Sequence, residues 1–339
     1  MNTRTRYFVI TSLLVLAVGL GTGLVAYYVG LPGGLVGRDG PDELQYMPQN
    51  AAVVAYVDVR EIMLSDVRQK IRRLVPPGSP AGADGQRQFQ DQTGIDIESD
   101  IDHVVASLQP GPDGRMAGLV VARGRFSEVK IEALMREHGA EVGEYKGKRV
   151  IAYQPGNPGD NAPRRAGDSI ALSFLEPGLV AVGSGEVLRA AIDLQATGAN
   201  VTKNAEIMDL MRSLGPGNAW AIGRLDAMLA NSRLPAQFTS QIPAITWFSV
   251  SGSVDHDIRG IVRADTRDEE AANNLRDVVR GFLALAKLQA GSRPEFQVMM
   301  QSLELGGTGK RVALSFSIPG SVLDALGANA PAAQKPLAN

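Results

Sequence analysis

The side chains that most often carry catalysis are few in this sequence. Of 339 residues, three are histidine and none is cysteine, which excludes cysteine nucleophiles, thiolate zinc sites and disulfides. The histidines are His103, His138 and His256, and no two stand at the His-x-x-x-His spacing of paired zinc ligands. His103 begins a predicted strand and His256 lies in a predicted turn. We therefore predict no catalytic residue and no metal ligand among them.

One acidic cluster has a spacing that could bind a cation. Asp96, Glu98, Asp100 and Asp102 alternate with isoleucine or serine, and an extended strand would place all four carboxylates on one face. Such oxygen ligands suit a hard cation such as calcium. A charged edge strand that resists aggregation explains the same pattern, and we favour that interpretation. No metal site is predicted here.

Two glycine motifs resemble chemical signatures only in part. Gly147-Lys148 and Gly309-Lys310 are followed by arginine and lead into predicted strands, whereas a phosphate loop continues with Ser or Thr into a helix. Ser184 stands between glycines, but the Gly-x-Ser-x-Gly pattern of a nucleophile elbow is absent. We interpret the Gly-Lys pairs as turns, and Ser184 and Asn204 as helix N-caps. The chain is predicted to be no enzyme and to hold no cofactor.

The elements that would position these residues begin with a motif that occurs twice. Asn50 leads through an apolar run to Asp58, and Asn218 leads through a second apolar run to Asp226. Each run predicts a buried strand bounded by turn residues. Asp58 with Glu61 has the spacing of a capping box, and Asp226 is predicted to cap a helix in the same way.

Both halves continue in a similar order, with a hairpin, a helix and further strands. Hairpins are predicted at 104–122 and at 244–264. The predicted fold class is α+β, with two related units of antiparallel sheet and helices packed on one face, behind one N-terminal transmembrane helix. After the second hairpin, Thr266 and Glu269 are spaced as a capping box. The helix that follows, 267–290, is predicted to lay one apolar stripe on the sheet, formed by Leu275, Val278, Val279, Phe282, Leu285 and Ala286.

Short matches between the halves leave their alignment open. Gly147-Lys148-Arg149-Val150 recurs as residues 309–312, whereas the segment 171–178 resembles 313–320 at a different offset. A long loop inserted at 154–169 in the first copy would reconcile the two offsets.

The N-terminal segment is long and apolar enough to cross a membrane. Tyr7 to Gly30 carries no charge over 24 residues, and at ~1.5 Å per residue it exceeds the ~30 Å hydrocarbon layer. Arg4 and Arg6 precede it, which predicts a cytoplasmic N-terminus and an extracytoplasmic remainder. A cleaved signal peptide is the alternative. Gly19 and Gly23 could allow two such helices to approach as a homodimer, although glycine is common in membrane helices.

Composition and charge complete the predicted layout. Apolar residues make up 44% of the chain and charged residues 21%, which fits folded domains behind a single anchor. Formal net charge is −2, or −4 without the two N-terminal arginines, so no nucleic-acid partner is expected. The predicted segments are the cytoplasmic N-terminus 1–6, the anchor 7–30, a Gly/Pro-rich tether 31–45, the first repeat 46–214, the second repeat 215–327 and a disordered tail 328–339.

A resemblance adds a location to this layout. The segment from Pro48 to Arg60 reads Pro-x-Asn-Ala-x-x-x-Ala-Tyr-Val-Asp-Val-Arg. It resembles the opening line of a broad group of uncharacterised bacterial exported proteins that repeat an α+β unit. The likeness covers residues 46–64 and the repeat order, and it implies an envelope location but no catalytic residues.

We therefore expect a protein of the bacterial inner membrane whose C-terminal part is periplasmic. The leading hypothesis is a non-enzymatic binding or scaffolding protein whose partner is an envelope protein or another envelope component such as lipid. A carrier of a lipid or other apolar ligand, held between sheet and helices, is the first alternative. An envelope enzyme of unknown reaction is the second, and it requires His103, His256 or the acidic cluster to meet in one cleft.

Overall fold

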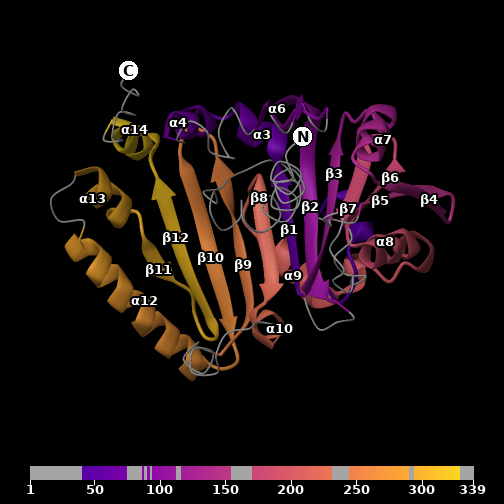
Figure 1. Ribbon diagram of the computed structural model, residues 1–339. Helices are drawn as coiled ribbons and strands as arrows, with labels where there is room; N and C mark the ends of the chain where they lie inside the picture. Colours follow the sequence, from indigo (N-terminus) through magenta and orange to yellow (C-terminus); the bar gives the residue numbers. More distant parts are fainter. Residues whose placement is uncertain are drawn as a thin grey trace, which may run out of the picture.

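The fold is a single large antiparallel sheet with helices around it. The computed structural model describes residues 40–74, 86–87, 90–91, 94–111, 116–153, 170–230, 244–289 and 294–328. Within them twelve strands pair in the order β11-β12-β10-β9-β8-β1-β2-β3-β7-β6-β5-β4 (Figure 1). The predicted α+β class with an antiparallel sheet is thus confirmed. The strands are β1 (Val53–Asp58), β2 (Ile101–Pro110), β3 (Met116–Gly124), β4 (Glu141–Tyr145), β5 (Lys148–Tyr153), β6 (Ile170–Glu176), β7 (Leu179–Gly183), β8 (Ala219–Arg224), β9 (Ile245–Val254), β10 (Ile258–Thr266), β11 (Glu304–Gly306) and β12 (Arg311–Ile318).

The helices precede, separate and follow these strands in the chain. They are η2 (Asp42–Tyr46), α3 (Val59–Leu64), α4 (Asp66–Leu74), α6 (Ile97–Asp100), α7 (Glu128–Glu137), α8 (Gly185–Thr197), η4 (Val201–Lys203), α9 (Ala205–Arg212), α10 (Leu225–Ala230), α12 (Glu269–Gln289), α13 (Pro294–Gln301) and α14 (Gly320–Ala328).

The two predicted motif copies meet at the centre of the sheet. β1 and β8 pair antiparallel, with Ala55 opposite Ala221. The amide of Asp58 donates to the carbonyl of Asn218 at 2.6 Å, and the amide of Arg224 donates to the carbonyl of Ala52 at 2.7 Å. These bonds close both ends of the β1–β8 ladder, so the predicted units share one continuous sheet.

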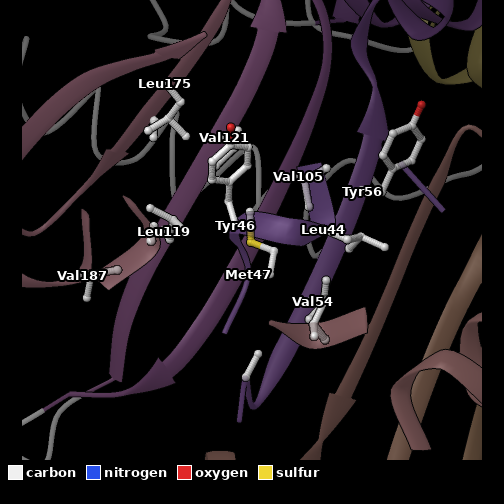
Figure 2. Packing of buried hydrophobic residues seen from close by; sticks show 14 of the residues in the cluster. Leu44, Tyr46, Met47, Val54, Tyr56, Val105, Leu119, Val121, Leu175 and Val187 are labelled. Carbon is white, nitrogen blue, oxygen red and sulfur yellow. The ribbon is translucent and has the colours of Figure 1, made fainter. Parts of the chain in front are cut away.

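The sheet bears helices on both faces, whereas one covered face was predicted. Alternate strand residues point to opposite faces, and here both sets are buried. On one face Val54 and Val105 pack with α8, α9 and η2 (Figure 2). On the other face Val104 and Val120 pack with α3, α6 and α7. Continuous apolar runs such as 53–57 are the signature of a strand buried on both sides, which explains the difference.

The described part of the fold begins inside the segment predicted as a tether. In η2, Glu43 and Leu44 are almost fully buried, and Tyr46 beyond them is inaccessible. Leu44, Tyr46 and Met47 pack in the same core as α8. Burial of these side chains against the sheet makes η2 part of the folded unit, although the segment 31–45 has the Gly/Pro content of a linker.

Helix capping agrees with the sequence in the first copy and differs in the second. The Asp58 carboxylate accepts from the amide of Glu61 at 2.8 Å, which is the predicted N-cap. Asp226 lies within the first turn of α10 and binds Arg224 at 2.7 Å, so it does not cap that helix from outside. The strands begin at Val53 and Ala219 and end at Asp58 and Arg224. The second strand therefore begins and ends two residues earlier, relative to its Asn and Asp, than the first does. This shift places Asp226 inside the helix.

The cap of α12 also differs from its prediction. The Asp268 carboxylate accepts from the amide of Ala271 at 2.8 Å, which makes Asp268 the N-terminal acceptor. Thr266, the predicted cap, instead donates to the carbonyls of Asp268 and Lys310. Thr266 lies at the end of β10, where its hydroxyl is close to backbone carbonyls and not to the free amides of the helix.

The short sequence matches do not occupy equivalent places in the sheet. Gly147 and Gly309 lie before β5 and β12, and β12 pairs with β10, whereas β7 holds the place beside β3. After α7 the chain forms the edge strand β4 and returns toward β3 through β5, β6 and β7. After α12 it forms the opposite edge strand β11 and returns to β10 through β12 alone. Lys146 and Gly147 both have positive φ in the two-residue β4–β5 turn, which confirms turn chemistry there. The inserted loop 154–169 lies outside the described residues.

The predicted anchor and tail also lie outside the described part of the chain. This applies to residues 7–30, with Gly19 and Gly23, and to residues 329–339. Among the residues that the structure describes, no helix combines the length and apolarity needed to span a membrane. The anchor, the homodimer and the division into two repeats stay predictions.

Candidate functional site

Helix α12 carries the most unusual surface of the described fold. Its 21 residues correspond to ~31 Å at ~1.5 Å rise per residue. Ala271 and Ala272 are buried in its first turn. From Asn273 to Leu288 no side chain is buried. The helix runs along the outer edge of the sheet, beside β11 (Figure 1).

Large exposed apolar side chains concentrate on this helix. In the described residues eight such side chains are exposed, and four of them belong to α12. These four define the apolar face of α12: Val278, Phe282, Leu285 and Leu288. Phe282 is 68% exposed and Leu288 is 78% exposed. Spacings of four, three and three residues place them along one side of the helix.

The adjacent side of the helix is apolar as well. Leu275, Val279, Leu283 and Ala286 are half-buried, and α12 contacts β10, β11 and β12. At about 100° per residue, the apolar side chains from Leu275 to Leu288 together cover roughly 220° of the helix circumference, which is about twice the ~100° stripe of an ordinary surface helix. The predicted stripe was therefore wrong in part. Its members Val278, Phe282 and Leu285 point away from the sheet because one sheet face cannot cover so wide an arc.

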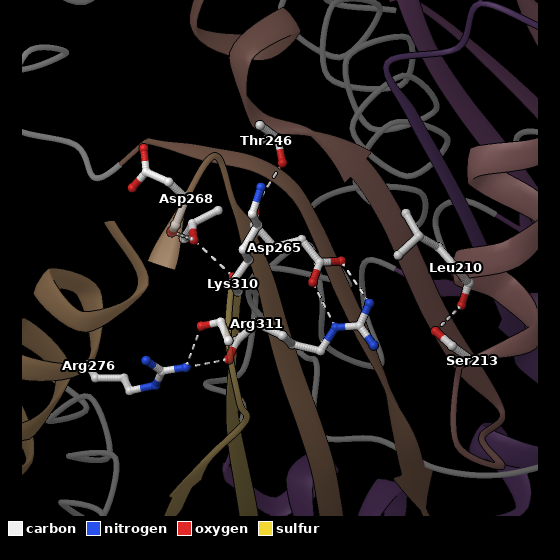
Figure 3. A network of polar contacts seen from close by, with 10 residues as sticks. Leu210, Ser213, Thr246, Asp265, Asp268, Arg276, Lys310 and Arg311 are labelled. Atoms are coloured by element: carbon white, nitrogen blue, oxygen red, sulfur yellow. Dashed lines mark hydrogen bonds and ion pairs between the residues drawn. The ribbon is translucent and has the colours of Figure 1, made fainter. Parts of the chain in front are cut away.

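Polar bonds hold only the N-terminal half of α12. The Arg276 guanidinium donates to the carbonyls of Gly309 and Arg311 at 2.8 and 2.9 Å. Arg311 in turn binds the Asp265 carboxylate at 2.7 and 3.1 Å (Figure 3). These contacts tie the start of the helix to the β11–β12 connection. Beyond Val278 the charged residues of α12 are Arg280 and Lys287, both positive.

A second polar group lies under η2, and sequence analysis missed it. Glu43 is 2% exposed, its Oε2 lies 3.0 Å from His103 Nε2, and its Oε1 accepts from Arg123. Tyr46 donates to Glu176 at 2.8 Å and accepts from Gln195 at 2.6 Å. Burial alone would raise the pKa of Glu43, but the hydrogen bonds from His103 and Arg123 outweigh it and lower the pKa to about 2.

This Glu43 group is explained by structure rather than chemistry. Burial, followed by the bond to Glu176, raises the pKa of Tyr46, so the phenol is protonated at neutral pH and acts as a donor. The carboxylate of Glu43 has its charge matched by Arg123, and the bonds join η2 to β2, β3 and β6. They anchor η2, most of which lies inside the segment 31–45 that was predicted as a tether. No sequence signal could have identified Glu43, because its partners lie at least 60 residues away in the chain.

The predicted candidate residues are not brought together. His103 lies at the start of β2 beside Glu43, and His138 follows α7, where its Nδ1 lies 2.6 Å from the Leu134 carbonyl. His256 lies in the β9–β10 turn, with its Nδ1 2.6 Å from Asp66. His103 and His256 are at the same end of the sheet, but β1 and β8 intervene, which at ~4.8 Å per strand separates them by roughly 15 Å. They form no common cleft.

The acidic cluster is not the extended strand that its alternation suggested. Asp96 caps the short helix α6, accepting from Glu98 at 2.9 Å, and the Asp100 carboxylate accepts from the Asp96 amide. Glu98 pairs with Arg68 at 3.0 Å, and Asp102 pairs with Arg60. Local N-cap bonds therefore prevailed over the period of two. In the part of the chain that the structure describes, no group of His, Asp or Glu is placed to hold a metal ion.

Ser184 and Asn204 serve as the N-caps predicted for them. The Ser184 hydroxyl accepts from the Val187 amide at 3.4 Å at the start of α8, and Asn204 accepts from Ile207 at 3.2 Å. Both roles are structural. The apolar face of α12 is thus the surface whose side chains the fold itself does not explain.

Comparisons with known proteins add one likeness of fold. No protein-family model and no curated sequence matches the chain. A solved structure of TP0453, in its crystal form I, aligns with 84% of this chain and 98% of that chain, at 10% sequence identity and a TM-score of 0.46. At that score the likeness carries no argument about function.

Proposed function

We propose that this chain is a non-enzymatic binding protein, held at the bacterial inner membrane by residues 7–30 with its folded part in the periplasm. It binds an apolar partner on its C-terminal unit. The observation that carries the proposal is the apolar face of α12, where Phe282 and three aliphatic side chains are exposed in succession. Isolated apolar residues are ordinary on protein surfaces, whereas contiguous ones mark interaction sites.

The charged groups of the described fold support a binding function. The titratable residues considered as catalysts lie apart from one another, and each has a structural partner. The apolar face, in contrast, has no structural role in covering the sheet. Leaving these side chains in water is unfavourable by roughly 25 cal/mol per Å² of exposed apolar area. A partner that covers them would recover this free energy.

A second candidate function is the carriage of an apolar ligand between α12 and the sheet. Val262 is exposed on β10, although this strand is flanked by β9 and β12. The inner side of α12 is only half-buried. A ligand with an acyl chain would cover both. Lipid that co-purifies with the intact chain in stoichiometric amount, after the anchor is removed by proteolysis, would favour this function.

The proposal is tested by crosslinking at the apolar face in native membranes. The chain has no cysteine, so a single introduced cysteine carries a photoreactive group to one place. A Cβ at Gly281 would meet no atom within 4 Å, which makes Gly281→Cys a mild change beside Phe282. Val129→Cys on α7, at a residue 83% exposed, is the matched control.

We expect adducts from residue 281 and few from residue 129. The adduct identifies the chemical class of the partner, protein or lipid. If the photoreactive groups at both positions reacted with water alone and gave equally few adducts, the result would contradict the proposed binding function.

A further inference from the structure

The face of the sheet that bears α8 changes in character from the first half to the second. Two strands outward from β1, Val121 on β3 pairs with Val105 on β2. Two strands outward from β8, Arg263 on β10 pairs with Ser249 on β9. Ser249 also lies opposite Ile222, which belongs to the same core as Val121, and directly opposed residues share a face. An arginine therefore stands where the first half has an inaccessible core valine.

The helix that covers this place in the first half is directed elsewhere in the second. α8 follows β7 and packs with Val121, whereas α14 follows β12 and packs Leu323 against Val254 and Ile258. Ile258 is an odd number of residues from Arg263 along β10, so its side chain points to the other face. In the described part of the fold Arg263 is half-buried, and α14 does not cover it.

Arg263 has a positive charge that its neighbours do not compensate. Asp265, the next residue on the same side of β10, accepts from Arg311 through both carboxylate oxygens, at 2.7 and 3.1 Å (Figure 3). Among the described residues Nη1 of Arg263 is buried and has no hydrogen-bond acceptor. Burial, followed by the charge of Arg311, lowers the pKa of Arg263, so the cation is unfavourable in these surroundings. A buried charge without a partner opposes folding, which a bound anion would relieve.

Two serines beside Arg263 complete a set of hydrogen-bond donors. Ser249 lies directly opposite it, and Ser251 lies opposite Ile261, which makes Ser251 a diagonal neighbour at ~7–8 Å, within reach of a long side chain. The two serines are 3% and 1% exposed, and the Ser251 hydroxyl, like Nη1 of Arg263, is buried without a partner in the described residues. A guanidinium fork with hydroxyl donors matches the two oxygens of a carboxylate.

We propose that Arg263, Ser249 and Ser251 bind the carboxylate of a small organic acid. One uncompensated positive charge matches one carboxylate, because the charge of Arg311 is already balanced by Asp265. Only a narrow group reaches serines as buried as these. The site uses none of the residues in the apolar face of α12, so it goes beyond the proposed function and is tested independently of it.

The first test measures whether Arg263 stabilises the fold by itself. Arg263→Met keeps an apolar stem and removes the charge. In chloride buffer without carboxylates, the melting temperature of the intact chain in neutral detergent should rise by about 2 °C, because an unpaired charge is removed. Arg259→Met, at an exposed residue on the same side of the same strand, is the matched control and should leave the melting temperature unchanged.

The second test measures binding, with acetate as the probe. The chain has two tryptophans, and both lie on this face, with Trp220 opposite Ser251 and Trp247 opposite Asp265. Their fluorescence therefore reports on the site. Acetate replaces chloride at constant ionic strength, and phosphate is titrated in parallel. We expect a saturable fluorescence change with acetate that is stronger than the change with phosphate.

The variants assign this response to the proposed residues. Arg263→Met should raise the apparent dissociation constant for acetate at least about tenfold, and Ser251→Ala about fivefold. Arg259→Met should retain the wild-type value.

Three results would overturn the inference. A melting temperature that falls in Arg263→Met would show that the arginine stabilises the fold without a ligand. An acetate response that is absent, or that is unchanged in Arg263→Met, would exclude Arg263 as the carboxylate ligand. A response to phosphate as strong as the response to acetate would indicate general attraction of anions. Each of these results leaves the proposed function of the apolar face of α12 intact.

Discussion

Helices α7 and α12 each follow the second strand of a hairpin, and they differ in what they bury. α7 buries Ile131 against the sheet and exposes mainly charged residues, with Val129 as its one large exposed apolar residue. α12 buries only Ala271 and Ala272 and exposes four large apolar side chains in succession. The same element order therefore supports a compact helix in one half and a loosely packed one in the other.

The difference teaches that covering the sheet does not require the apolar content of α12. One buried residue and a narrow stripe suffice for α7. The wide apolar arc of α12 adds exposed area that the described fold does not use, and this excess is best explained by a partner outside the sheet. The two halves also differ in core. Two clusters on opposite faces lie around β1, β2 and β3, whereas a small cluster around Val254 and Leu323 joins α4 to α14.

The largest expected effect compares one leucine from each region. Leu188 of α8 is inaccessible and Leu285 of α12 is 59% exposed. Leu188→Ala should lower the free energy of unfolding by about 3 kcal/mol, because it leaves a cavity, and Leu285→Ala by less than about 0.5 kcal/mol. Denaturant unfolding of the intact chain in detergent, followed by tryptophan fluorescence, measures both. Similar losses would mean that α12 is packed as tightly as α8.

The second prediction concerns acid stability of the tightly packed region. The pKa of Glu43 is lowered from 4.5 to about 2, so its ionised form stabilises the fold above pH ~4.5, and this contribution is lost as pH falls toward 2. At about 1.4 kcal/mol per pKa unit it amounts to at most about 3 kcal/mol. Glu43→Gln should lower stability at pH 7 and flatten this acid dependence.

Thermal unfolding between pH 7 and pH 3 measures the effect of Glu43. Glu137→Gln, at an exposed carboxylate that ends α7, is the matched control and should follow the wild type. If Glu43→Gln kept the wild-type slope, the buried ion pairs with His103 and Arg123 would not set the acid stability.

A smaller effect compares the two motif aspartates. Asp58→Ala removes the N-cap of α3 and should cost about 1 kcal/mol. Asp226→Ala removes an exposed pair with Arg224 and should cost at most about 0.5 kcal/mol. The difference between their unfolding free energies measures the capping term. If Asp226→Ala lowered the unfolding free energy as much as Asp58→Ala, the two aspartates would be equivalent, as the repeated motif predicted.

The smallest effect concerns the contact between α4 and the β9–β10 turn. The bond to Asp66 and the charge of Asp255 raise the pKa of His256. Its stabilising contribution is therefore complete below its ordinary pKa and is lost as pH rises through the raised value. His256→Asn should lower the melting temperature slightly at pH 6 and still less at pH 9. An equal decrease at both pH values would indicate a contribution that does not depend on charge.

Local chemistry made several elements predictable. The apolar runs at 53–57 and 219–223 gave β1 and β8, and Ser184, Asn204 and Asp58 cap the helices that follow them. These features depend on residues within one turn or one strand, so their spacing is sufficient. The predicted turn at Gly147 was correct for the same reason, since only the local backbone decides it.

Tertiary packing decided the rest. The sequence by itself predicted the central strands, the caps at Asp58, Ser184 and Asn204 and the α+β class, and it placed an apolar stripe, which is part of a wider arc, on the helix at 269–289. It could not determine that both faces of the sheet are covered, that Glu43 is buried with His103 and Arg123, or which part of that arc faces water. Those outcomes depend on which distant segments meet. An apolar pattern along the chain shows which side chains avoid water, but it does not show which neighbours cover them.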